Sequence, residues 1–224
     1  MFDRVLFLND VVFSTEDVLE LLATRGGNYA AACSMDFARP PQFYDTFALR
    51  DAEGHEAVMP TFPYFRAKSS RDAITSGQPT PVTSCWNGIV AFDAGPFYAT
   101  PPLQFRGIPD SLAQYQLEAS ECCLIHADNP LTKTSGVWLN PNVRVGYSAT
   151  AYEKVYAGPS VSEMILGAWI NRLRRWTTAT IHKSWRINWR LRKWRKTAGQ
   201  LDEAGRHCLI NEMQVLVANG WAHI

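Results

Sequence analysis

The stretch RVLFLNDVVFSTEDVLELL near the N-terminus restricts the fold more than any other part of the sequence. Its apolar run at residues 5–8 predicts a strand of the buried, parallel type. Ser14, followed three residues later by Asp17, predicts the start of a helix over VLELL, which a Gly-Gly pair ends. A second apolar run at residues 29–34 predicts the next buried strand. We therefore expect an α/β fold to begin here.

The end of the first predicted strand carries the first candidates for chemistry. Asn9 and Asp10 follow the apolar run directly. In open α/β sheets, ligands bind beyond the carboxyl ends of strands, in the crevice where chain connections diverge. A carboxylate there can hold Mg²⁺ or Mn²⁺ together with substrate phosphates, and Asn9 can add a neutral carbonyl oxygen. An Asp10 that merely caps the loop into the helix is an equally supported alternative.

The composition is that of a globular chain. Of its 224 residues, 46% are hydrophobic, which suffices for one sizeable core or two small ones. No stretch of the sequence approaches the roughly 20 consecutive apolar residues that span a bilayer. The start MFDRVLFLND lacks the basic-then-apolar order of a signal peptide. Five cysteines, an odd number without a Cys-x-x-Cys pair, favour buried thiols over a zinc site or a disulfide framework.

Basic and acidic residues are distributed unevenly along the chain. Residues 1–160 carry 11 Lys and Arg against 17 Asp and Glu, whereas residues 161–196 carry 10 against one. Apolar residues recur in this basic segment at three- and four-residue steps, among them Trp169, Leu173 and Trp176. That spacing predicts amphipathic helices with an arginine-rich outer face.

Three alternatives explain the basic segment. The favoured one packs the tryptophans on the α/β core and leaves the arginines in water. The second lays residues 161–196 on an anionic membrane surface, and nucleic acid is the least favoured partner. The pair Gly158-Pro159 marks a boundary. We therefore expect an α/β domain over residues 1–157 and a basic, tryptophan-rich helical region over residues 158–224.

Two further patterns predict local structure near candidate residues. The dipeptide Asn87-Gly88 lies between two β-rich runs in PVTSCWNGIVAFD, which predicts a β-hairpin. Residues 112–128 have helical spacing, with apolar side chains at Leu117 and Leu124. This helix would bring several carboxylates onto one face.

Six ordered blocks carry a resemblance to a known family. They are FLNDVVFSTEDVLELLATRGGNYAAACSMDF, YDTFALRDAEGHEAVMPTFPYFR, SCWNGIVAF, FRGIPDS, SECCLIHADNP and GVWLNPNVRVGYSA. Together they resemble the fungal capsule-associated, cryptococcal-type α-1,3-mannosyltransferases over about residues 3–157. The resemblance implies a GT-A-like α/β glycosyltransferase on the luminal side of the Golgi membrane. It also implies transfer of mannose from GDP-mannose to a mannose-containing glycan or glycolipid with retention, and a divalent metal, Mn²⁺ or Mg²⁺.

The resemblance gives roles to several acidic residues. In such folds a metal-binding Asp-x-Asp motif follows a buried strand, and Leu8-Asn9-Asp10 takes that place with only its last acid, so Asp10 is the expected metal ligand. Glycosyl transfer passes through an oxocarbenium-like state that a nearby carboxylate stabilises. Glu121, in the block SECCLIHAD, is the expected catalytic carboxylate and Glu118 the alternative. An exposed helix face that carries Glu118, Glu121 and Asp128 is the simpler explanation.

The remaining candidates are expected to contact donor or acceptor. The run Trp86-Asn87-Gly88 offers an indole face for a sugar ring, an amide for hydroxyls and a glycine that permits close approach. His126 and Asp128 are candidates for the metal or the diphosphate, although a structural hydrogen bond is the more common role of a histidine near a helix end. Asp36, after the second strand, is a further candidate carboxylate, and an Asx-type turn is its alternative.

Glycosyltransferases of this kind place nucleotide-binding βαβ units and a membrane anchor ahead of the first strand. We therefore expect the chain to begin in the middle of a catalytic domain, as an N-terminally truncated half-domain with a mixed sheet. The alternative is a non-catalytic family member that acts as a membrane-associated or partner-binding module. Motifs of other enzymes, such as Gly-x-Ser-x-Gly and His-Glu-x-x-His, are absent from the sequence.

Overall fold

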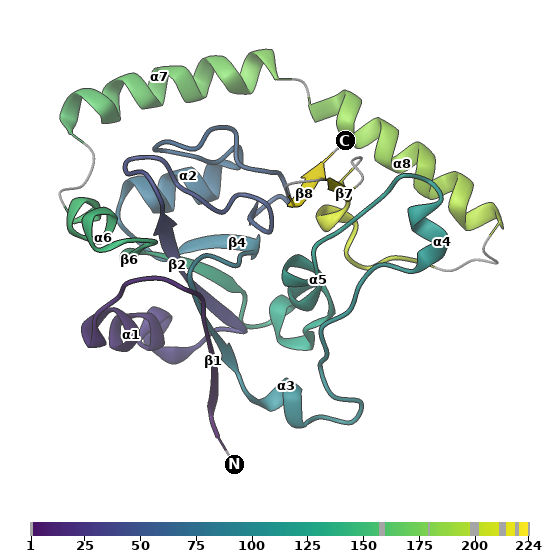
Figure 1. The fold of residues 1–224 in the computed structure, drawn as a ribbon, viewed down its shortest axis with the longest axis horizontal. Helices are drawn as coiled ribbons and strands as arrows, with labels where there is room; N and C mark the ends of the chain where they lie inside the picture. Colours follow the sequence, from purple (N-terminus) through teal and green to yellow (C-terminus); the bar gives the residue numbers. More distant parts are fainter. Residues whose placement is uncertain are drawn as a thin grey trace.

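The computed structural model describes residues 2–156, 160–178, 180–197, 202–210, 214–217 and 220–223. A six-stranded sheet in the order β1-β5-β2-β6-β4-β3 forms its centre (Figure 1). β2 and β6 pair in parallel and the other neighbours pair antiparallel, which confirms the predicted α/β class with a mixed sheet. The strands are β1 (Arg4–Leu8), β2 (Ala31–Phe37), β3 (Arg50–Asp51), β4 (Thr80–Ser84), β5 (Ile89–Asp93) and β6 (Val137–Gly146), with a separate antiparallel pair of β7 (Gln214–Val217) and β8 (Gly220–His223).

Helices surround this sheet. Along the chain they are α1 (Thr15–Leu22), η1 (Thr24–Gly27), α2 (Lys68–Thr75), α3 (Gly95–Tyr98), α4 (Asp110–Ala113), α5 (Glu121–Asp128), η2 (Pro130–Lys133), α6 (Ala149–Val155), α7 (Val161–Thr177), α8 (Thr180–Thr197) and η3 (Arg206–Cys208), where η marks a 3-10 helix. α7 and α8 follow one another along one side of the molecule, and α3 lies at the opposite end (Figure 1). Among the described residues, no helix combines the length and the hydropathy needed to cross a membrane.

The strand, loop and helix predicted at the N-terminus are present, with one correction. Ser14 Oγ accepts a hydrogen bond from the amide of Asp17, and Asp17 Oδ2 accepts one from the amide of Ser14 at 2.8 Å, which completes the predicted capping box of α1. β1, however, is an antiparallel edge strand that pairs with β5 and is only half-buried. The prediction of a buried, parallel-type first strand is wrong, because β5 returns beside it.

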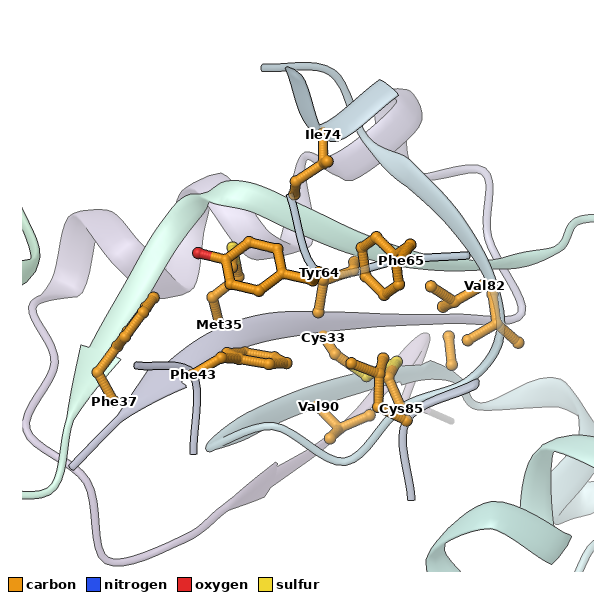
Figure 2. Close-up of a cluster of buried hydrophobic side chains, with 14 of the residues drawn as sticks. Cys33, Met35, Phe37, Phe43, Tyr64, Phe65, Ile74, Val82, Cys85 and Val90 are labelled. Carbon is orange, nitrogen blue, oxygen red and sulfur yellow. A yellow bond between two sulfur atoms is a disulfide. The ribbon is translucent and has the colours of Figure 1, made fainter. Parts of the chain in front are cut away.

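The sheet is buried at β2, as the apolar run at residues 29–34 predicts. All seven residues of β2 are buried. Alternate side chains from Cys33 to Phe37 enter the cluster in Figure 2, where Phe43, Phe65 and the α2 residue Ile74 cover them. On the other face, Ala32 packs with Leu21 of α1. Helix and loop layers therefore hold β2 on both faces.

The hairpin predicted at Asn87-Gly88 is wrong. β4 and β5 flank this dipeptide, but β2 and β6 lie between them in the sheet. Gly88 has φ +74°, in the left-handed region that glycine favours. The Asn-Gly dipeptide therefore does mark a residue with a left-handed backbone. The connection from β4 to β5, however, crosses the end of the sheet and does not form a hairpin.

The helix predicted over residues 112–128 is divided into α4 and α5. Gln116 has φ +54° between them, and Glu118 forms an isolated antiparallel bridge with Ile210. The prediction that Glu118, Glu121 and Asp128 share one helical face is therefore wrong, because tertiary pairing outweighs the helical spacing.

The structure also corrects the cysteine prediction. Cys33 and Cys85 form one disulfide, and Cys123 and Cys208 form a second. Cys122 is the free, half-buried thiol. Spacing alone did not reveal these bonds, because they join residues 52 and 85 positions apart. The first fastens β2 to the segment after β4, and the second fastens α5 to η3.

The basic segment forms helices as predicted, but α7 turns its apolar face to solvent instead of toward the core. Its buried residues are Gly167 and Asn171, while Trp169, Leu173 and Trp176 are exposed. The favoured packing of the tryptophans on the α/β core is therefore wrong for Trp169 and Trp176, whereas Arg172 and Arg174 are exposed as predicted. The boundary predicted at Gly158-Pro159 lies outside the described residues.

Candidate functional site

The carboxyl ends of β1, β2 and β6 meet at one edge of the sheet, beside the amino end of β5. β1 runs in the same direction as β2 and β6 because two antiparallel pairings, through β5, separate it from β2. Four segments far apart in sequence thereby bring Asn9, Asp36, Asn87 and Tyr147 to one place. This is the edge at which ligands bind in open α/β sheets.

Asp36 forms the centre of this cluster and is fully buried. Its Oδ1 accepts hydrogen bonds from the Asn87 amide nitrogen and from the backbone amide of Asp45, both at 3.2 Å. Its Oδ2 accepts one from the Tyr147 hydroxyl at 3.1 Å. Asn87 also donates to the Asp45 carbonyl at 2.6 Å. One buried carboxylate thus holds three segments together.

The environment of Asp36 changes its acidity. Burial, with a further contribution from the charge of Asp45, raises the pKa of Asp36 to about 7, although hydrogen bonds from Asn87, Asp45 and Tyr147 oppose the shift. The pKa of Tyr147 is also raised, by burial and by the charge of Asp36, so its hydroxyl keeps its proton and remains a donor. The cluster therefore contains a carboxyl that titrates near neutral pH.

Ser34 and Gly88 fix the position of Asn87 beside Asp36. The Ser34 hydroxyl donates to the Asn87 carbonyl oxygen and accepts a hydrogen bond from the Ile89 amide at 3.0 Å. A Cβ atom on Gly88 would lie 2.5 Å from Cγ2 of Val145 and 3.3 Å from Cβ of Asp36. Glycine is therefore required by space as well as by its φ angle.

The loop after β1 crosses this edge of the sheet. The Asn9 backbone amide donates to the Gly88 carbonyl at 2.9 Å, and its side chain lies close enough to Tyr147 to oppose the rise of the tyrosine's pKa. A backbone bridge between Val12 and Gly146 fastens the far end of the loop. Asp10 lies between these two anchors with its side chain exposed.

Two tyrosines stand beside the cluster. The rings of Tyr44 and Tyr147 are 4.7 Å apart, and Tyr44 is 58% exposed. Sequence reasoning missed both tyrosines and Asp45. The available signal is positional: Tyr147 follows the last residue of β6, and Tyr44 and Asp45 lie in a loop whose backbone returns to Asp36. An aromatic edge next to buried polar groups suits a sugar ring.

Comparison with known families identifies the family of this chain. Residues 1–128, more than half of the chain, match the family model described as cryptococcal mannosyltransferase 1. The chain belongs to this mannosyltransferase family. The match extends from β1 to the end of α5 and includes Asn9, Asp36, Asp45 and Asn87.

A curated relative supports the same assignment. The chain is 27% identical over 183 residues to alpha-1,3-mannosyltransferase CMT1 of Cryptococcus neoformans var. neoformans serotype D. The alignment covers 75% of this chain and 38% of the relative, so the chain spans less than half of that protein's length. No solved structure matches the chain.

Within this mannosyltransferase-family chain, Trp86 contacts other aromatic rings. Its ring lies 5.2 Å from that of Phe7 and 5.6 Å from that of Phe105, and it is half-buried. It therefore stabilises the junction between β1 and the loop after α3. Its role as a sugar platform stays a prediction, and the exposed Tyr44 offers an alternative platform beside Asp36.

Of the two predicted catalytic carboxylates, Glu121 is the more exposed. It is exposed at the first position of α5, next to Cys122. Burial, then the charges of Glu121 and Asp45, raise the pKa of the Cys122 thiol to about 12, which places the start of α5 near Asp45. Glu118 is half-buried and its backbone pairs with Ile210. The catalytic role of Glu121 stays a prediction.

His126 is placed inside the core. It is fully buried, bonds the Cys85 carbonyl through Nε2 at 2.7 Å and stacks on Phe92 at 5.2 Å. Burial lowers its pKa to about 4, so the ring is neutral at physiological pH. These contacts match the structural role named as the more common alternative.

Asp128 is engaged in an ion-pair network. Arg106 donates to both of its oxygens, at 2.5 and 3.0 Å, and to both oxygens of Glu203. The network joins the loop before α4, the end of α5 and the segment before η3. Asp128 thus stabilises the fold at a place separate from the Asp36 cluster.

Proposed function

We propose that this chain is part of a glycosyltransferase that moves mannose from GDP-mannose to a mannose-containing glycan or glycolipid. By analogy with the named activity of its relative, the product linkage is α-1,3, formed with retention in a GT-A-like domain. The observation that carries the proposal is the Asp36 cluster, which lies at the ligand-binding edge of the sheet in a chain of the mannosyltransferase family.

The side chains of the cluster suit a sugar ligand. Tyr44 and Tyr147 present aromatic surface for a pyranose ring, and Asn9 presents an amide for hydroxyl groups. Asp36 is buried, so it acts as a positioning residue that fixes Tyr147 and Asn87. Glu121, exposed at the start of α5, is the proposed carboxylate at the reacting centre.

The proposed ligand of a divalent cation is Asp10, in the loop after β1. Among the described residues, no group of three close metal-ligand side chains includes Asp10. Mg²⁺ and Mn²⁺ do not need one, because they commonly take one or two carboxylates, water and substrate phosphate oxygens. Asp10, exposed beside Asn9, would hold the ion. When bound, the ion neutralises charge that develops on the leaving diphosphate.

The disulfides support a luminal location. Disulfide bonds persist in oxidising compartments and are rare in the cytosol. The Cys33–Cys85 and Cys123–Cys208 bonds therefore favour the Golgi lumen that we propose for this chain.

Calorimetry with GDP-mannose tests the proposal. We expect binding that requires Mn²⁺, is lost in Asp10→Ala and is retained in Asp3→Ala. The control removes the same charge at the other end of β1, where Asp3 is also exposed. Retained binding in Asp10→Ala, or no binding by a wild-type chain shown to be folded by circular dichroism, would overturn the assigned donor site. Transfer of mannose to an α-mannoside, followed by chromatography, then tests Glu121→Gln.

A further inference from the structure

The outer face of α7 is apolar. Trp169 is 65% exposed and Trp176 is 70% exposed, and they lie on the side of the helix that faces away from the body. Aliphatic residues extend this face along the helix. They are Val161, Ile165, Leu166 and Leu173. A soluble amphipathic helix places such residues toward the core, so α7 has the reverse orientation.

Small and polar groups attach α7 to the body. The Asn171 amide donates to the Phe65 carbonyl, and Arg66 donates to the Arg175 carbonyl at 3.1 Å. Gly167 lies against the Phe62 carbonyl, where a Cβ atom would approach the oxygen to 2.3 Å. The orientation of α7 is therefore set by specific contacts, and they leave its apolar face in solvent.

α8 packs differently, but it also carries exposed indole rings beside cations. Its inner face buries Leu191 and Trp194. Trp185 and Trp189 are exposed and stacked at 6.5 Å, and Lys193 lies 3.7 Å from the Trp189 ring. α7 and α8 follow one another on the same side of the molecule (Figure 1). Each of the two helices thus carries exposed indole rings.

The charges accompanying these rings identify the partner. Arg172 lies over the rings of both Trp169 and Trp176, at 5.8 and 5.0 Å. Residues 161–196 contain 10 Lys and Arg and the single acid Glu163. A second copy of this surface would bring like charges together, whereas an anionic bilayer offers both negative charge and an apolar interior. Indole rings with neighbouring cations are typical of the bilayer interface.

We propose that α7 and α8 form a docking surface for an anionic lipid membrane. The indole and aliphatic side chains of α7 enter the boundary between headgroups and acyl chains, while Arg172 and Lys193 contact lipid phosphates. The inference is independent of the transferase proposal, because it uses no residue of the Asp36 cluster.

Vesicle flotation of the 224-residue chain tests this inference. We expect binding to phosphatidylcholine vesicles that contain about 30% phosphatidylserine, and weak binding to phosphatidylcholine alone. Trp169→Ser with Trp176→Ser should reduce partitioning about tenfold or more. Arg172→Gln with Lys193→Gln should reduce it about fivefold or more on anionic vesicles and little on neutral ones. Tyr98→Ser on α3, a half-exposed ring at the other end of the molecule, should change nothing.

Three results would overturn the inference. One is equal binding to neutral and anionic vesicles. A second is no vesicle binding by a chain whose circular dichroism shows it folded. A third is concentration-dependent self-association in analytical ultracentrifugation that the double tryptophan variant abolishes, without vesicle binding, which would assign the surface to a second copy. A blue shift of tryptophan emission on anionic vesicles, lost in about 0.5 M salt, provides an independent readout.

Discussion

The Tyr147 hydroxyl donates a 3.1 Å hydrogen bond to the buried carboxyl of Asp36, and so joins the ends of two parallel strands. The bond links the end of β6 to the end of β2. Asn87, which lies just before β5, donates a hydrogen bond to the same carboxyl and so connects a third strand. The polar cluster is thus both a part of the fold and the centre of the candidate site. Changes to it should affect stability and ligand binding together.

Asp36→Asn should change how stability depends on pH. The folded pKa of about 7 lies above the ordinary value of 3.8, so the folded chain retains a proton that the unfolded chain loses. The contribution of Asp36 is therefore fully present below about pH 4 and is lost as pH rises through 7, on the order of 4 kcal/mol over that window. Urea unfolding of Asp36→Asn should show a flatter profile from about pH 4 to 8.

Comparison of Asp36→Asn with Tyr147→Phe separates the effect of Asp36 titration on stability from the effect of lost packing and hydrogen bonding. The amide that Asp36→Asn introduces can still accept from Asn87, and the Tyr147 hydroxyl can rotate to accept from its nitrogen. Tyr147→Phe removes a hydrogen bond that favours the ionised carboxyl, so it should raise the pKa of Asp36 further and keep the pH dependence. Identical profiles for wild type and Asp36→Asn would contradict the raised pKa.

Gly88→Ala should destabilise the chain by about 3 kcal/mol or more, because it adds an overlap with Val145 to an unfavourable φ of +74°. Gly77→Ala is the matched control. Its φ is +66°, but a Cβ there meets no atom within 4 Å, so the cost should be about 1 kcal/mol. Urea midpoints of the two variants measure the difference, and equal losses would show that Val145 yields easily.

Thiol titration should find one free cysteine in the unfolded, unreduced chain and five after reduction. Four cysteines form the two disulfides, and Cys122 remains free. Cys33→Ser should cost about 2–5 kcal/mol because it opens a loop of 52 residues. Cys122→Ser should cost much less. A titre of five thiols before reduction would show that the cysteines are unpaired.

Local patterns predicted local structure well. The capping box at Ser14 and Asp17 and the apolar run of β2 depend on near neighbours in sequence, and both are present. The Asn-Gly signal at Asn87 reported a left-handed backbone, but nothing nearby could indicate that β2 and β6 lie between its flanking strands. Strand order depends on long-range packing that a single sequence does not display.

The candidate site was partly predictable for the same reason. Asn9 and Asp36 follow predicted strands, so position made them candidates, and Asn87 was a candidate because its amide lies beside Trp86 and Gly88. Their meeting at one sheet edge, and the participation of Asp45 and Tyr147, follow from strand direction. The reversed α7 was missed because periodicity shows which residues share a face, and it does not show which face is buried.

Arg106→Met should destabilise the chain by about 2–3 kcal/mol, because it leaves the Glu203 carboxylate buried without its cation. The contribution of Glu203 to the pH dependence should also reverse. Burial tends to raise the pKa of Glu203, but hydrogen bonds from Arg106 and the Gly205 amide outweigh it and hold the pKa below 4.5. Glu203 therefore stabilises the wild type above about pH 4.5, and that contribution is lost as pH falls through its lower folded pKa.

Without Arg106, burial dominates, and the pKa of Glu203 should rise above its unfolded value. The variant should then become more stable as pH falls from about 6 to 4, whereas the wild-type contribution of Glu203 persists down to about pH 4.5 and then begins to fall. Arg106→Met with Glu203→Gln should recover much of the lost stability, because the neutral amide no longer needs a cation, although Asp128 remains unpaired in both variants. Urea unfolding at about pH 4, 5 and 6 measures these effects. A loss in Arg106→Met that is the same at every pH would assign the destabilisation to lost packing of the arginine stem rather than to an unpaired carboxylate.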